Sequence, residues 1–237
     1  NNKPFGGIQL FMSGDFLQLQ PVKDRVLIES SEFEEEYVDQ MFELTEIYRQ
    51  EDKVFSELLN EVRVGRLPDE LIKLLEKNYD EFIAMGGKIK PTHLYCTVRN
   101  TEQHNQNELN KLESTKINIS ARNKSDFDIS RFREAACRAP EKLELAIGAQ
   151  VMTTINADNY VNGTRGVIVG YENDIIEIQV LNGGTIFVPR AKYDIVLQGR
   201  VVGHRFIHPI ALAWAMTIHK SMGLSMDYVY IDLNGVF

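Results

Sequence analysis

The chain has 237 residues, of which 43% are hydrophobic and 25% are charged, a composition typical of a globular protein. No apolar run approaches the roughly 20 residues that a helix needs to cross a bilayer. The formal net charge of −8 argues against a surface coated with basic residues for non-specific nucleic-acid binding, but it does not exclude a local basic groove. Cys96 and Cys137 have no metal-ligand spacing, and we interpret them as reduced thiols of an intracellular protein, with a single disulfide as the alternative.

The first part of the chain mixes strand and helix patterns. Residues 8–12 (IQLFM) form an apolar run between two glycine-containing segments and predict a buried strand. Apolar residues at helical spacing over 54–63, followed by Gly65, predict a helix, and Pro68 opens a second helix with Leu71, Leu74 and Leu75 facing inward. The other expected elements are a short helix over 32–40, a strand over 42–48, a strand over 93–97 and a helix over 101–112. This mixture is typical of an α/β domain.

The pattern changes after about residue 116. Between residues 149 and 189 the chain consists of short β-branched runs separated by turn residues, with strands expected over 167–171, 175–181 and 185–188. The sequence VNGT over 161–164 carries an Asn-Gly hairpin signature. This segment predicts a small antiparallel barrel. The apolar run over 209–215, a helix-like TIHKS and a strand over 228–233 then return to the α/β pattern, so a β module is inserted into an α/β domain.

Polar residues follow the first predicted strand in the segment SGDFLQLQPV, residues 13–22. In α/β folds, ligands bind at the carboxyl ends of strands. Asp15 can hold water around a metal ion there, and Gln18 can donate to a terminal phosphate oxygen while it accepts from an attacking water. The alternative is an Asp that caps a turn and a Gln on the surface, and these residues taken alone favour it.

A predicted strand ends in an arginine in the segment LTEIYRQ, residues 44–50. The guanidinium of Arg49 can bind a phosphate bidentately and stabilise the charge that develops in phosphoryl transfer. A salt bridge to nearby carboxylates is the alternative, and it is the better interpretation of this segment taken alone.

A third polar segment lies near the C-terminus of the chain. Thr217, His219, Lys220 and Ser221 crowd into five positions ahead of Gly223, and such a cluster can donate several hydrogen bonds to backbone phosphates. A lone His is more often structural. With four donors together, the functional and structural interpretations are evenly balanced.

The sequence contains no phosphate-binding loop. Residues 86–88 (GGK) lack both the upstream glycine and the following Ser or Thr of such a loop. The strand-like run 229–231 ends in Asp232, but Leu233 follows where a nucleotide hydrolase with a phosphate loop normally carries a catalytic Glu.

Taken in order, these segments resemble the Pif/RecD-like branch of superfamily-one DNA helicases, in particular the petite-integration-frequency family. The family's motif close to GDFxQLPPV is similar to GDFLQLQPV over residues 14–22, and other family motifs resemble LTEIYRQ over 44–50 and TIHKSMGLSMD over 217–227. The segments GAQVM over 148–152 and VNGTRG over 161–166 also look like family segments. The resemblance covers nearly the whole chain, and the order of the motifs makes it specific.

The resemblance implies an α/β fold, a RecA-like helicase domain with an inserted small SH3-like β-barrel. The implied parts are the end of a first RecA-like domain (1–25), the first part of a second (26–117), the β module (118–204) and the second part of the second domain (205–237). ATP would lie between the two RecA-like domains, with Mg²⁺. Gln18 would sense its terminal phosphate and Arg49 would act as an arginine finger, so these two are the implied catalytic residues. The implied nucleotide-binding residues are Asp15, Gln18, Arg49 and Gly223.

The resemblance also implies single-stranded DNA and DNA junctions as partners, no membrane, and translocation from 5′ to 3′. The implied DNA-binding residues are Thr97, Asn162, Thr217, His219, Lys220 and Ser221. The location would be intracellular, in the nucleus or mitochondrion of a eukaryote; telomeric, repair and recombination roles occur in the family, and nothing in the sequence chooses among them.

Three residues depart from the family pattern. Gln20 replaces a proline, Met222 replaces a Gln after HKS, and Val98 stands where Asn is common, which puts individual contacts in doubt. The family's phosphate loop and Asp-Glu metal motif are expected upstream of Asn1, and its last motif beyond Phe237. We therefore expect the chain to be part of a longer helicase and not to hydrolyse ATP alone.

Two other functions remain open at this point. The chain could be a non-catalytic DNA- or protein-binding module with the barrel as its working surface, and the acidic net charge favours a protein partner. It could also be a subunit of a RecD-like nuclease complex. Arg49 separates the first of these from a motor, since only a motor requires it.

Overall fold

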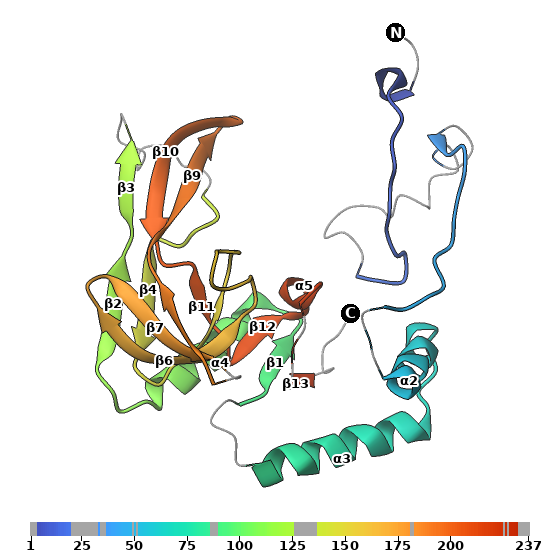
Figure 1. Ribbon diagram of the computed structural model, residues 1–237, viewed down its shortest axis with the longest axis horizontal. Helices are drawn as coiled ribbons and strands as arrows, with labels where there is room; N and C mark the ends of the chain where they lie inside the picture. The colour runs from blue at the N-terminus through green and yellow to red at the C-terminus, as the bar shows by residue number, and fades with distance from the viewer. Residues whose placement is uncertain are drawn as a thin grey trace. The chain divides into compact units, whose positions relative to one another are not determined.

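The computed structural model describes residues 4–19, 33, 37–48, 50, 52–85, 90–125, 137–180, 183–224, 226 and 228–231 (Figure 1). The chain divides into two compact units, residues 1–87 and 88–237. Each is described by itself below. None of the helices in the described part combines the length and apolar composition that a membrane crossing needs.

The first unit contains a 3₁₀ turn, η1 (Pro4–Gly7), and two helices, α2 (Lys53–Arg63) and α3 (Asp69–Met85). Both predicted helices are confirmed. The side chain of Asp52 caps α2 by accepting from Phe55 N at 3.0 Å. Gly65, at φ +82°, follows the last turn of α2 in the left-handed conformation that glycine tolerates best. Leu71 is buried as expected, but the prediction for Leu75 is wrong, since its side chain is 51% exposed.

Two strand predictions in the first unit are wrong. Residues 8–12 and 42–48 have no regular secondary structure, and apolar side chains in both segments are exposed, Phe11 at 89% and Phe42 at 79%. The physical reason is the lack of a partner, because the described residues of this unit include no strand with which either segment pairs. The helix predicted over 32–40 lies largely outside the described residues.

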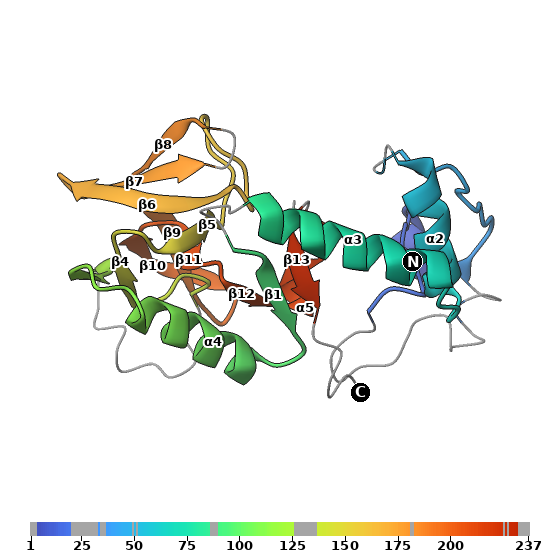
Figure 2. The same cartoon turned by 90° about the horizontal axis from the view of Figure 1, so that it is seen from below.

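The second unit contains a parallel sheet with the order β12 (Ala215–Thr217), β1 (Thr92–Tyr95), β13 (Val229–Ile231). Helix α4 (Val98–Asn110) follows β1 and packs against β12 and β1 (Figure 2). The buried side-chain amide of Asn105 accepts from Ala215 N at 2.8 Å and donates to Ala215 O at 2.9 Å, which attaches α4 to the edge strand. The short helix α5 (Ile218–Ser221) follows β12. These elements confirm the predicted return to an α/β pattern.

The rest of the second unit is antiparallel. A five-stranded sheet has the order β11 (Ile210–Leu212), β5 (Gln150–Thr153), β6 (Arg165–Glu172), β7 (Ile175–Val180), β8 (Thr185–Val188). A three-stranded sheet has the order β3 (Arg122–Ser125), β10 (Arg200–Ile207), β9 (Ala191–Leu197), and β2 (Lys116–Ser120) pairs with β4 (Lys142–Ala146). The strands predicted over 167–171, 175–181 and 185–188 are therefore confirmed to within a few residues.

The predicted small barrel is not confirmed. Among the described strands, β11 pairs only with β5 and β8 pairs only with β7, so the five-stranded sheet is open at both edges. A closed barrel requires every strand to have two hydrogen-bonded neighbours. The Asn162-Gly163 signature does form a turn, in which Thr164 N donates to Val161 O at 3.1 Å, but the turn lies within the longer connection between β5 and β6.

The core of the second unit joins its antiparallel elements. Leu145 of β4, Val151 of β5, Ile168 of β6 and Ile178 of β7 are each no more than 1% exposed and pack in one cluster with Trp214. Leu109 of α4 belongs to the same cluster. A second cluster contains Leu94 of β1, Met152 of β5 and Met216 of β12, so the parallel sheet and the five-stranded sheet are packed together by apolar contacts.

Candidate functional site

Asp15 and Gln18 form one hydrogen-bonded turn in the first unit. Asp15 Oδ1 accepts from Leu17 N at 3.0 Å, and Gln18 Nε2 donates to Asp15 Oδ2 at 3.3 Å. Arg63, at the end of α2, donates to Asp15 Oδ1 at 2.8 Å. These contacts, the Arg63 hydrogen bond first, hold the pKa of Asp15 below its ordinary value. Asp15 is therefore ionised at neutral pH, and Gln18 keeps its carbonyl oxygen available as an acceptor.

The contact between Arg63 and Asp15 is not evident from the sequence pattern. Arg63 lies 48 positions from Asp15, and its place in the last turn of α2 suggests only a helix-dipole interaction. Arg49 and residues 20–22, by contrast, lie outside the described residues.

Thr97 and Thr217 lie together at the carboxyl-end edge of the parallel sheet, where strands β1 and β12 end. Strands β1 and β12 are parallel neighbours, with Tyr95 opposite Thr217, so both strands end at this same edge. Each threonine caps the helix that follows. Thr97 Oγ1 accepts from Asn100 N at 3.2 Å, and Thr217 Oγ1 accepts from Lys220 N at 3.3 Å. Each hydroxyl oxygen accepts one hydrogen bond as a helix cap, and each O–H group can still donate a hydrogen bond.

The remaining residues of the TIHKS segment lie on α5. His219 and Lys220 are exposed, and Lys220 forms no ion pair with any residue in the described part of the chain. Ser221 Oγ donates to Ile218 O at 2.8 Å, within the helix. Gly223 has φ +79°, in the left-handed region.

Asn162 approaches the same region from the connection between β5 and β6. A Cβ atom placed on its neighbour Gly163 would lie 2.9 Å from Leu224 Cδ2, so this turn packs directly beside the segment after α5. Asn162 N donates to Asn156 Oδ1 at 2.8 Å, and its own side chain is exposed. The structure thus gathers Asn162 and the TIHKS segment, and it places Thr97 beside Thr217.

The edge formed by these residues suits an anionic ligand that lies across a protein surface. It offers the exposed side chains of Thr97, His219 and Lys220, while Thr217 is buried beneath them at 6% exposure. Each threonine lies at or just after the end of a strand and caps a helix. The backbone and the capping hydrogen bond therefore fix the positions of the two hydroxyl groups.

The residues that the structure describes contain no group of three or more His, Cys, Asp or Glu side chains able to hold a metal ion. Mg²⁺ bound with a nucleotide is held largely by phosphate oxygens and water and needs only one or two carboxylates. Asp15 fits that limited role.

Comparisons with known proteins agree with the sequence motifs. Residues 1–72 match the family model described as PIF1-like helicase. The chain is 35% identical over 247 residues to the ATP-dependent DNA helicase PIF1 of Homo sapiens, an alignment that covers 100% of this chain and 38% of the human protein. The chain therefore spans about two fifths of that relative's length.

Two solved structures extend the similarity to the fold. Bacteroides sp. Pif1 in complex with ADP-AlF4 matches with a TM-score of 0.71 and 27% identity, covering 100% of this chain and 58% of that one. Bacteroides Pif1 bound to ssDNA matches with a TM-score of 0.57 and 27% identity over the same shares of the two chains. The fold is therefore that of the RecA-like helicases, with an antiparallel β segment within it.

Proposed function

Since this chain is a homologue of the PIF1-like helicases over nearly its whole length, we propose that the protein containing it is an ATP-dependent DNA helicase. It translocates 5′ to 3′ on single-stranded DNA and unwinds duplex or structured DNA. The observation that carries the proposal is the common edge of β1 and β12, where Thr97 and Thr217 cap two helices side by side. A related protein, Bacteroides Pif1, has been solved with ssDNA.

In this proposal the DNA backbone follows that edge. Thr97 and Thr217 donate their hydroxyl hydrogens to phosphate oxygens, and Lys220 supplies a positive charge. Asn162 lies in the turn beside Leu224, and His219 and Ser221 lie on α5. These three residues supply the remaining proposed contacts with the DNA backbone. The contacts are to phosphates and therefore independent of DNA sequence, as a translocating motor requires.

The nucleotide is proposed to lie against the turn formed by Asp15 and Gln18. Gln18 would orient the attacking water with its side-chain carbonyl, and Asp15 would help to hold Mg²⁺ through a water molecule. Mg²⁺, when bound with ATP, neutralises phosphate charge. Arg49 would stabilise the charge that develops on the transferred phosphoryl group. Gly223 is also proposed as a nucleotide-binding residue, on the family resemblance alone.

The finer architecture is also a proposal. We assign residues 1–25 to a first RecA-like domain, 26–117 and 205–237 to a second, and 118–204 to an inserted module of SH3-like type. The chain by itself is not expected to hydrolyse ATP, because its sequence contains no phosphate-binding loop.

The direction of unwinding, from 5′ to 3′ or from 3′ to 5′, provides the test of the proposed activity. The full-length protein, with ATP and Mg²⁺, should displace a labelled strand from a duplex with a 5′ single-stranded tail and should fail on the matching 3′-tailed duplex. Equal activity on both substrates would refute the polarity, and activity on neither would refute the helicase assignment.

Lys220→Ala should weaken single-strand binding and reduce its salt dependence. One lost phosphate contact lowers the slope of log K against log salt by about 0.7 for a single strand. The slope is measured by fluorescence anisotropy over a salt series with the full-length protein. Lys142→Ala, at an exposed lysine on β4 away from this edge, is the control and should keep the wild-type slope. An unchanged slope for Lys220→Ala would remove the phosphate role.

A further inference from the structure

The three-stranded sheet β3-β10-β9 exposes one face with a distinct composition. The register pairs Lys124 with His204 and Arg122 with Phe206. It also pairs His204 with Asp194 and Phe206 with Lys192. Because directly opposed residues point to the same face of a sheet, one face is made by these six side chains: Arg122, Lys124, Lys192, Asp194, His204 and Phe206. We call this set the β3-β10-β9 face.

Burial shows that this face points to solvent. The intervening residues Ile195, Arg205 and Ile207 are buried, at 1%, 9% and 0% exposure, and lie on the opposite side. Arg122, Lys124, Lys192 and Asp194 are exposed, and His204 and Phe206 are half-buried. The alternation is that of a sheet with one side against the core and one side free.

The charge on this face is positive although the whole chain is negative. Lys124 and Lys192 form no ion pair with any described residue, and Asp194 is the only carboxylate on the three strands, where it pairs with His204 at 2.9 Å. Arg200, at the start of β10, is also exposed. In a chain with a net charge of −8, such a local excess of cations is a specific feature of this sheet.

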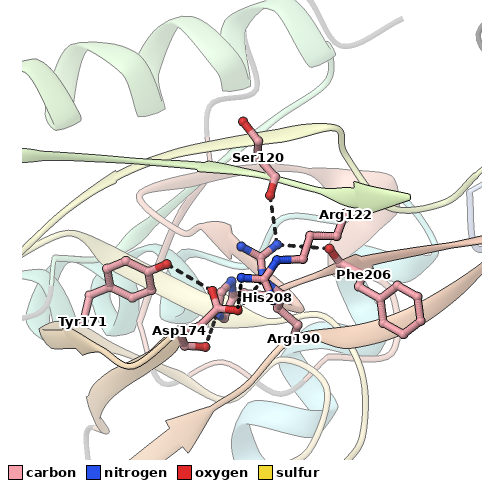
Figure 3. A network of polar contacts seen from close by, with 7 residues as sticks. All are labelled: Ser120, Arg122, Tyr171, Asp174, Arg190, Phe206 and His208. Carbon is pink, nitrogen blue, oxygen red and sulfur yellow. Dashed lines mark hydrogen bonds and ion pairs between the residues drawn. The ribbon is translucent and has the colours of Figure 1, made fainter. Parts of the chain in front are cut away.

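Arg122 adds to that excess despite its ion pair. Its guanidinium lies 3.1 Å from Asp174 Oδ2, but Arg190 Nε donates to the same oxygen at 2.7 Å (Figure 3). Tyr171 donates to the other oxygen at 3.1 Å. The hydrogen bond from Arg190, above all, holds the pKa of Asp174 below its ordinary value. One carboxylate therefore faces two guanidinium groups, so the cluster keeps a net charge of +1.

An aromatic ring lies among these cations. Lys124 Nζ lies 5.6 Å from the centroid of the Phe206 ring. The ring points away from the Asp174 cluster (Figure 3). A hollow of about 630 Å³ opens at the same sheet, lined in part by Lys124, Arg200 and His204. Cations grouped around a partly exposed ring are the surface chemistry that binds a single-stranded nucleic acid, through phosphate contacts and base stacking.

We propose that the β3-β10-β9 face binds single-stranded DNA as a second contact region, separate from the Thr97 and Thr217 edge. Lys124 and Lys192 contact phosphates, and a base stacks on Phe206. The inference rests on the proposed DNA-binding function. The ring favours a single strand over a duplex, because the bases of a duplex are already stacked.

The test uses the full-length protein and the double variant Lys124→Gln/Lys192→Gln. Loss of two phosphate contacts should lower the slope of log K against log salt by about 1.4 and weaken single-strand affinity roughly tenfold or more at 0.1 M salt. Phe206→Leu, which keeps an apolar side chain, should weaken single-strand binding roughly fivefold or more and leave blunt-duplex binding unchanged. Lys142→Gln is the matched control and should behave as wild type.

The outcomes separate this inference from the proposed function. If the wild type binds the single strand and Lys220→Ala changes its slope, but the double variant behaves like Lys142→Gln, the second contact region is wrong and the helicase proposal stands. If the double variant loses only duplex binding, the face binds duplex and the inference as stated is wrong. If the wild type binds no single strand, both are overturned.

Discussion

Replacing Arg49 by alanine in the full-length protein is expected to lower ATP turnover by a factor of about 10³ or more. An arginine finger stabilises the charge on the transferred phosphoryl group as that charge develops. Single-strand binding should remain near the wild-type level, because the proposed DNA contacts lie on other segments. Steady-state phosphate release and anisotropy, measured on the same preparations, give the two quantities.

Arg66→Ala is the matched control for this prediction. The Arg66 guanidinium is exposed and pairs with Glu61 at 3.0 Å within the same part of the chain, so its loss should leave turnover unchanged. If Arg49→Ala kept turnover within a few-fold of wild type, the finger assignment would be wrong. Equal losses of turnover and DNA binding would instead indicate damage to the fold.

Gly166→Ala is expected to destabilise the second unit by about 3 kcal/mol, at the upper end of overpacking penalties. Gly166 lies in β6, opposite Val180 of β7. An added Cβ would lie 2.5 Å from Ile178 Cγ2 and even closer to the backbone oxygen of Gln179. The backbone oxygen of Gln179 cannot withdraw without separating β6 from β7. Thermal unfolding should show a midpoint lower by several degrees.

Gly170→Ala, in the same strand, tests whether that effect comes from the backbone contact. The nearest atom to its added Cβ is Glu177 Oε2 at 2.6 Å, the free end of a flexible side chain that can rotate away. We expect a change of less than about 1 kcal/mol at this position. Similar midpoints for the two variants would contradict the packing argument.

The elements that local sequence defines were predicted well. Helix α2 has a capping Asp52, an apolar face and Gly65 after its end, and β6, β7 and β8 have β-branched residues between clear turn residues. In each case the information lies within a few neighbouring residues. Thr217 was selected from its cluster of polar residues and Thr97 from the family resemblance, but their proximity follows only from the parallel pairing of β1 with β12.

The predictions that failed needed information from distant residues. The apolar run 8–12 has strand composition, but a strand also needs a hydrogen-bonded neighbour, and none is described in its unit. Whether a set of short strands closes into a barrel depends on pairings such as that of β11 with β5, which are 57 or more positions apart. Local sequence patterns also do not predict the contact of Arg63 with Asp15 or the two guanidinium groups at Asp174. In both cases the contacts join residues that are distant in the sequence.

Single-strand-stimulated ATP turnover by the full-length protein is the measurement that decides whether the protein is a motor. We expect low turnover without DNA, strong stimulation by single-stranded DNA with Mg²⁺, and loss of that stimulation in Arg49→Ala. A wild-type protein that binds DNA but shows no stimulated turnover would contradict a motor function, and the chain would then belong to a non-catalytic binding protein.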